Sequence, residues 1–151
     1  MDNSRSLGVS LSGCTLPETG LSTFSLEDGK MEFGMGLHGE AGIKKVDIMT
    51  ADDTAQTLLD LLIEDLPFNK GDEVIALINN YGSTTKMEMY IIAGKIHSYL
   101  RQKNISIYST EIGAFCTSQE MAGVSITLMK LDDELKKYYD MPCNAPGFKK
   151  L

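Results

Sequence analysis

The chain has 151 residues, of which 42% are hydrophobic and 23% charged, a composition typical of an ordinary globular domain. Its 14 basic and 21 acidic residues give a net charge of −7, which argues against nucleic-acid binding because that requires clustered Lys and Arg. No apolar run approaches the roughly 20 residues needed to cross a bilayer, so no membrane partner is expected. The first residues lack a signal-peptide pattern and the 3 cysteines lack C-x-x-C spacing, which favours a reducing, cytoplasmic setting.

The hydrophobic periodicity predicts eight elements of secondary structure. Strands are predicted where apolar residues alternate or form a short run, at residues 6–11, 30–39, 73–79, 105–111 and 124–131. Helices are predicted where apolar residues recur at helical spacing, at residues 51–65, 85–103 and 131–139. Possible capping boxes, Thr50 with Asp53 and Thr85 with Glu88, precede the first two helices. The tail after residue 140 has no periodicity.

The order of these elements, β-β-α-β-α-β-β-α, does not alternate strictly between strands and helices. It predicts an α+β fold, a two-layer sandwich in which a mixed β-sheet carries helices mainly on one face, rather than a doubly wound fold. Neither an internal repeat nor a linker is visible in the sequence. Residues 1–151 are therefore expected to form a single domain.

The segment from Gly34 to Gly39 matches the pattern G-x-G-x-x-G. A dinucleotide site requires that motif between a strand and a helix, whereas these glycines lie inside a predicted strand. Gly34 and Gly36 would then flank His38 on one face of that strand. Glycine weakens a strand, so two at alternate positions indicate close approach of a small ligand, a bulge or tight sheet packing. On this pattern alone, His38 is either a functional residue or an ordinary packed or solvated histidine.

Other polar segments have simpler interpretations. His97 is predicted to lie on the surface of a helix, and two histidines so placed do not form a metal site, so none is expected. The segment 82–86 is not a Walker A loop and is read either as an anion-binding helix start or as a plain cap. The segment 116–120 either lines a site or caps a short helix.

Several stretches, in order along the chain, resemble the second half of the dihydroxyacetone-binding (K) part of dihydroxyacetone kinases. They are residues 5–9, 14–17, 31–43, 77–82, 87–91, 113–118 and 120–135. The most specific of them is G-x-G-x-H-G-E-x-G, at residues 34–42. The resemblance implies that residues 1–151 correspond to the C-terminal domain of the K subunit. The first domain, which carries an assisting acid and a second histidine, has no counterpart here.

In that family, the histidine of this segment bonds covalently to the carbonyl carbon of dihydroxyacetone as a hemiaminal. The resemblance therefore implies that His38 is catalytic, and that His38, Gly36 and Gly39 bind the triose. A neutral imidazole is a suitable nucleophile because its ordinary pKa of about 6.5 leaves it mostly uncharged near pH 7. Capture of a carbonyl selects ketones and aldehydes over glycerol.

The resemblance also implies partners. No cofactor is expected on this chain, whereas ATP or ADP with magnesium is expected on a nucleotide-binding L domain or subunit that donates the phosphoryl group. A homodimer and the missing first K domain are further expected partners. With that domain missing, the chain alone is expected to have little or no kinase activity. Two alternatives are a non-catalytic dihydroxyacetone-sensing paralogue that activates a transcription regulator, and a remnant that binds nothing.

Overall fold

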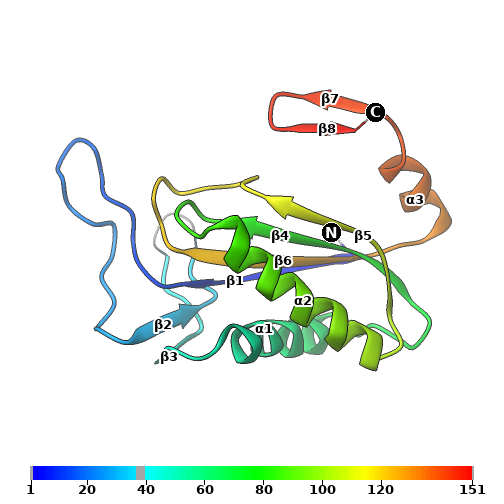
Figure 1. Cartoon of the computed structure of the whole chain (residues 1–151), viewed down its shortest axis with the longest axis horizontal. Coiled ribbons are helices and arrows are strands. Elements are labelled where there is room, and N and C mark those ends of the chain that lie inside the picture. Colours follow the sequence, from blue (N-terminus) through cyan, green and yellow to red (C-terminus); the bar gives the residue numbers. More distant parts are fainter. Residues whose placement is uncertain (1, 37–39, 151) are drawn as a thin grey trace.

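The computed structural model describes residues 2–36 and 40–150. A six-stranded sheet has the order β3-β2-β1-β6-β4-β5. Its strands are β1 (Ser4–Ser10), β2 (Lys30–Phe33), β3 (Lys44–Asp47), β4 (Glu73–Asn80), β5 (Ser106–Gly113) and β6 (Gly123–Lys130). The helices α1 (Ala51–Asp65) and α2 (Lys86–Gln102) both cover one face of it (Figure 1). At the C-terminus follow α3 (Asp133–Tyr139) and a hairpin of β7 (Cys143–Ala145) and β8 (Phe148–Lys150).

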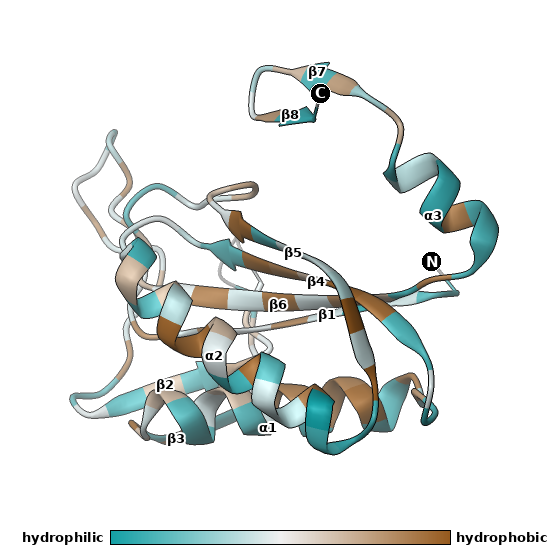
Figure 2. Ribbon diagram, turned by 45° about the vertical axis from the view of Figure 1, so that its right-hand side comes forward, coloured by the Kyte–Doolittle hydropathy of each residue, from teal (hydrophilic) through white to brown (hydrophobic). Residues whose placement is uncertain are grey.

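The sheet is mixed, as expected for an α+β sandwich. Strands β4 and β5 pair in parallel because α2 crosses over between them, whereas the other neighbouring strands pair antiparallel. Successive side chains of a strand point to opposite faces of the sheet, and along β6 buried and half-buried residues alternate. Figure 2 shows the matching alternation of hydropathy along β6. The predicted two-layer sandwich with helices mainly on one face is therefore confirmed.

The core lies between the sheet and the two helices. Ile126 and Leu128 of β6 are fully buried there, together with Leu58 and Leu59 of α1 and Ile96 of α2. Burying one such side chain stabilises a fold by about 1.5–3 kcal/mol. Most of the hydrophobic stabilisation therefore comes from this face. The opposite face, here called the cleft face, carries polar as well as apolar side chains, among them Ser125, Thr127 and Leu77.

The helix starts follow the sequence prediction. Thr85 caps α2 in a complete capping box, in which its side chain accepts the Glu88 N–H and Glu88 bonds back to the Thr85 backbone. At α1, the Thr50 hydroxyl oxygen accepts the Asp53 N–H at 3.2 Å. These contacts satisfy N–H groups that the first turn of each helix leaves free.

One predicted strand is shorter than expected. The alternation at 30–39 predicts a strand through Gly39, but β2 ends at Phe33 because Gly34 takes a left-handed conformation, with φ of +76°. Gly34 and Gly36 therefore do not lie in a strand, and the prediction that they share a strand face with His38 is wrong. His38 and Gly39 themselves lie outside the described residues.

The structure adds three strands that the periodicity does not indicate. Strand β3 is a four-residue edge strand in which only Val46 is half-buried, so it has no hydrophobic alternation to detect. Strands β7 and β8 are three residues each and belong to the C-terminal arm, defined here as α3, β7 and β8. Short, exposed strands of this kind are set by their pairing partners rather than by their own sequence.

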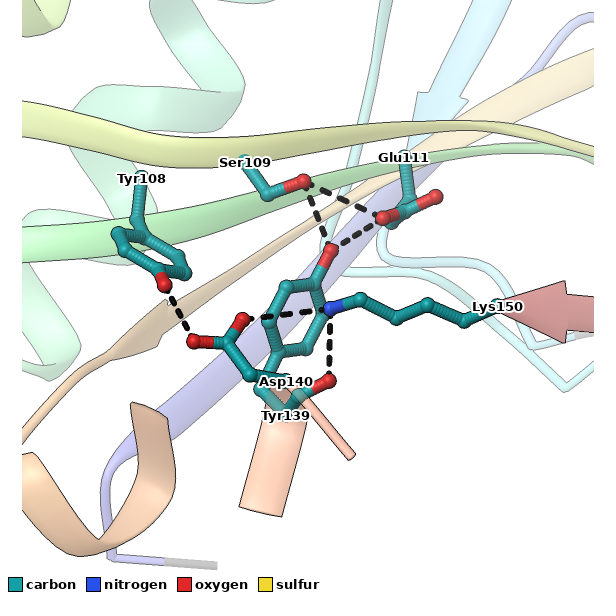
Figure 3. A network of polar contacts seen from close by, with 6 residues as sticks. All are labelled: Tyr108, Ser109, Glu111, Tyr139, Asp140 and Lys150. Atoms are coloured by element: carbon teal, nitrogen blue, oxygen red, sulfur yellow. Dashed lines mark hydrogen bonds and ion pairs between the residues drawn. The ribbon is translucent and has the colours of Figure 1, made fainter. Parts of the chain in front are cut away.

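The C-terminal arm is attached to β5 by polar contacts (Figure 3). The Tyr139 hydroxyl donates its proton to the Glu111 carboxylate, and its oxygen lies 2.7 Å from Ser109 Oγ. From the hairpin, Lys150 Nζ donates to the Tyr139 carbonyl at 2.7 Å and lies 3.4 Å from the centre of the Tyr139 ring. These contacts join the last strand of the arm to its helix and the helix to the sheet.

Candidate functional site

A cleft of about 400 Å³ opens on the cleft face of the sheet. Its floor is formed by two rows of paired residues across three strands: Ser6, Thr127 and Leu77 in one row, and Gly8, Ser125 and Asn79 in the next. The hydroxyls of Ser6 and Thr127 hydrogen-bond to each other at 2.5 Å. The floor therefore presents hydroxyl groups where the opposite face of the same strands presents the apolar core.

Tyr81 also lines the cleft, with its hydroxyl over Gly8 of the floor. It is 5% exposed, and its hydroxyl occupies the space that a side chain at residue 8 would need, since a Cβ on Gly8 would lie 1.8 Å from Tyr81 Oη. Burial raises the pKa of the Tyr81 phenol, and the hydrogen bond with Ser125 offsets this only in part. The phenol therefore stays protonated near neutral pH and keeps a proton to donate.

One wall of the cleft is formed by residues 34–36, the outgoing limb of the glycine-rich loop, which is defined here as residues 34–43 and is described at 34–36 and 40–43. Gly34, Met35 and Gly36 line the cleft. The Gly34 N–H donates to the Gly8 carbonyl at 2.8 Å, and the Gly36 N–H donates to the Glu40 carbonyl at 3.2 Å. A Cβ on Gly34 would lie 2.6 Å from Ile43 Cγ1, so glycine is required there for space as well as for its positive φ.

The opposite wall is a short segment that contains Phe115 and Cys116. The buried Asn79 side chain holds it with three hydrogen bonds: Oδ1 accepts the N–H groups of Phe115 and Cys116, each at 2.8 Å, and Nδ2 donates to the Cys116 carbonyl at 2.7 Å. Beyond this wall, Phe115 packs edge-on against Phe148 of the C-terminal arm, with ring centres 6.1 Å apart. One amide thus sets the width of the cleft on this side.

The predicted site residues fall in different places. Gly36 lines the cleft, whereas His38 and Gly39 lie outside the described residues. His97 is on α2, where its Nε2 lies 2.9 Å from Thr110 Oγ1, and it does not line the cleft. At residues 82–86 the structure shows the cap, with Thr85 and Glu88 forming a capping box at the start of α2.

The sequence reasoning assigned no role to Asn79, Tyr81, Ser125 or Thr127. The available signal was the outward position of Ser and Thr in alternating strands, but only the strand register shows that they form one floor. Among residues 2–36 and 40–150, no group of three or more His, Cys, Asp or Glu is placed to hold a metal ion. In the same residues, no helix is long and apolar enough to cross a membrane.

Comparison with known proteins identifies the family. Residues 1–147 match the model of the Dak1 domain. The chain belongs to the Dak1 domain family. It is 44% identical, over 147 residues, to the dihydroxyacetone-binding subunit DhaK of PTS-dependent dihydroxyacetone kinase 2 from Listeria innocua. That match covers 97% of this chain and 44% of the Listeria protein, so the chain spans less than half the length of this relative.

Two solved structures share the fold. A dihydroxyacetone kinase operon co-activator, Dha-DhaQ, superposes with a TM-score of 0.84 at 28% identity, over 93% of this chain and 44% of the co-activator chain. The native dihydroxyacetone kinase of C. freundii superposes with a TM-score of 0.81 at 30% identity, over 93% of this chain and 25% of the kinase. The resemblance to the K part of dihydroxyacetone kinases is therefore confirmed.

Proposed function

We propose that this chain is the dihydroxyacetone-binding part of a dihydroxyacetone kinase, and that His38 holds the triose as a covalent hemiaminal. One observation carries the proposal: the glycine-rich loop that contains His38 supplies Gly34, Met35 and Gly36 to the wall of a cleft with a hydroxyl-bearing floor. Hydroxyl groups of that kind are suitable partners for the two hydroxyls of dihydroxyacetone.

Formation of the hemiaminal needs only dihydroxyacetone and the His38 side chain. The unprotonated ring nitrogen of neutral His38 adds to the carbonyl carbon, so that a C–N bond forms while the C=O double bond becomes a single bond. The carbonyl oxygen gains a proton and the ring loses its N–H proton, and no water is released. A bound triose presents its free hydroxyl in a fixed position, which lowers the entropic cost of phosphoryl transfer.

The remaining parts of the reaction are proposed to lie outside this chain. ATP, or ADP with magnesium, would be carried by a nucleotide-binding L domain or subunit, and this chain would bind no cofactor itself. The first K domain would contribute the assisting acid and second histidine, residues 1–151 would act as a single domain, and the chain would form a homodimer in the cytoplasm. The length comparison supports this division, because the chain covers 44% of the Listeria subunit.

A second function is favoured by a specific observation. The structure with a TM-score of 0.84 is named as an operon co-activator, so a non-catalytic dihydroxyacetone sensor is the alternative. Both functions share the covalent step, and they differ in whether phosphate is transferred. Addition of a nucleotide-loaded L subunit and the first K domain distinguishes them, because only the kinase part would then yield dihydroxyacetone phosphate.

The covalent step is tested by native mass spectrometry with dihydroxyacetone. The expected result is a mass increase of one whole triose, without loss of water, which the His38→Ala variant abolishes and the matched His97→Ala variant keeps. A Schiff base on Lys44 or Lys45 would lose water and be fixed by borohydride. An unchanged adduct in His38→Ala would overturn the proposal.

A further inference from the structure

Glu32, on β2, is a buried carboxylate beside the glycine-rich loop, and only 4% of its surface is exposed. Its Oε1 accepts the Gly42 N–H at 2.7 Å. Its Oε2 lies 3.8 Å from Lys45 Nζ and, among the described residues, has no hydrogen-bond partner. Ser10, directly opposite on β1, is buried too, and its Oγ is equally unpaired in the part of the chain that is described. The Glu32 carboxylate is thus buried, and one of its two oxygens lacks a hydrogen-bond donor among the described residues.

The returning limb of the glycine-rich loop, residues 40–43, packs directly on the Glu32 side chain at Gly42. A Cβ on Gly42 would lie 2.4 Å from the Phe33 carbonyl oxygen and 2.7 Å from Glu32 Cγ, so only glycine fits. The next N–H, of Ile43, donates to the Phe33 carbonyl at 2.7 Å. Two successive N–H groups of the returning limb are therefore bound by adjacent residues at the end of β2.

Stability alone does not account for an acid at this place. A buried carboxylate with an unpaired oxygen costs free energy, and an apolar residue of similar volume is often as stabilising or more so. A carboxylate does fix the position of the N–H group that it binds. Its charge-assisted hydrogen bond is about twice as strong as a neutral one and favours a single geometry. Here that hydrogen bond joins Gly42 of the loop to β2.

We propose that Glu32 is a positioning residue, which holds the glycine-rich loop so that its outgoing limb, Gly34 to Gly36, keeps the cleft at the width that binds a small ketone. The inference rests on the proposed function, since dihydroxyacetone is the ligand whose affinity the loop would set. Glu32 does not line the cleft, so it acts through Gly42 and the loop rather than by touching the triose.

Three variants of the chain test this role. Glu32→Ala removes the acceptor of the Gly42 N–H, Glu32→Gln keeps an acceptor without the charge, and Asp47→Asn is a matched control that neutralises an exposed acid on β3. Each is titrated with dihydroxyacetone by native mass spectrometry, and amide hydrogen exchange is followed by NMR at Gly42 and at core amides of α1, which report folding.

The expected result for Glu32→Ala is at least tenfold weaker dihydroxyacetone binding and at least tenfold faster exchange at Gly42 than at the α1 amides. Glu32→Gln should recover most of the Gly42 protection and of the affinity, and Asp47→Asn should match the wild type. Equal affinity in Glu32→Ala and Asp47→Asn, or unchanged Gly42 exchange, would overturn the positioning role. If the wild type forms no adduct, the proposed function fails and the affinity claim with it, while the exchange data still decide whether Glu32 holds the loop.

Discussion

Replacing Asn79 with alanine tests how the second wall of the cleft is held. Besides a long hydrogen bond from Nδ2 to Ser125 Oγ, at 3.4 Å, the substitution removes the three hydrogen bonds that hold this wall, from the Phe115 and Cys116 N–H groups and to the Cys116 carbonyl. Each contributes about 0.5–1.5 kcal/mol to stability, which gives a loss of about 1.5–4.5 kcal/mol. Because Phe115 and Cys116 are exposed, water can replace part of what is lost, so we expect a decrease of about 2 kcal/mol in the free energy of unfolding.

The assay is urea denaturation followed by circular dichroism, with Asn144→Ala in the exposed β7 strand as the matched control. For a domain of this size, a loss of 2 kcal/mol lowers the melting temperature by about 4–8 °C. Alkylation of the exposed Cys116 thiol should also become faster, since its backbone is released. A loss no larger than that of Asn144→Ala would refute the reasoning that one amide holds this wall.

Three further predictions concern other parts of the structure. Gly34→Ala should lower the free energy of unfolding by about 1–3 kcal/mol in urea denaturation, because its φ of +76° is unfavourable for a side chain. Hydrogen bonds from Thr85 hold the pKa of Glu88 below its ordinary value, so its stabilisation is present above the unfolded-state pKa of about 4.3 and is lost as the pH falls through the folded-state pKa. The difference in the free energy of unfolding between wild type and Glu88→Gln, measured by urea denaturation, should therefore be larger at pH 7 than at pH 3. Thr127→Val should weaken dihydroxyacetone binding in native mass spectrometry, while the unfolding free energy changes by no more than about 1.5 kcal/mol, since one hydrogen bond, to Ser6, is lost. Unchanged binding would exclude this hydroxyl from the site.

The elements that the sequence predicts well are those that bury a hydrophobic stripe and begin with a cap. The prediction of 51–65 coincides with α1, since its apolar positions and the Thr50 cap both point to the same boundaries. The fold class followed from the order of such elements. The elements that were missed, β3, β7 and β8, bury little of their own surface, so hydrophobic periodicity carries no signal for them.

The glycine-rich loop shows a different limit of sequence reasoning. In the sequence, apolar residues alternate with polar or small ones over 30–39 as they would in a strand, but a left-handed glycine at position 34 ends β2 and turns the chain toward the cleft. The hydropathy pattern contains no information about backbone dihedral angles, so it does not reveal the positive φ of Gly34. The floor of the cleft was equally hidden, because Ser6, Thr127 and Ser125 come from β1 and β6, whose register only the structure provides.

One face of the sheet supplies most of the folding stability, and the other carries the candidate binding residues. This follows from the alternation of side chains along each strand, which sends neighbouring residues to opposite faces. On β6, Ile126 and Leu128 face the helices and are fully buried, while Ser125 and Thr127 between them face the cleft and are half-buried. Because hydrophobic burial is the main source of folding free energy, a substitution among the cleft-face hydroxyls costs the fold little. Ser10, Glu32 and Asn79 are instead buried on the cleft face, and two of them bind backbone: Asn79 accepts the N–H groups of Phe115 and Cys116, and Glu32 accepts the N–H of Gly42. The polar residues of this face therefore include half-buried hydroxyls available to a ligand, such as Ser125 and Thr127, and two buried side chains, Asn79 and Glu32, that hold backbone segments beside the cleft.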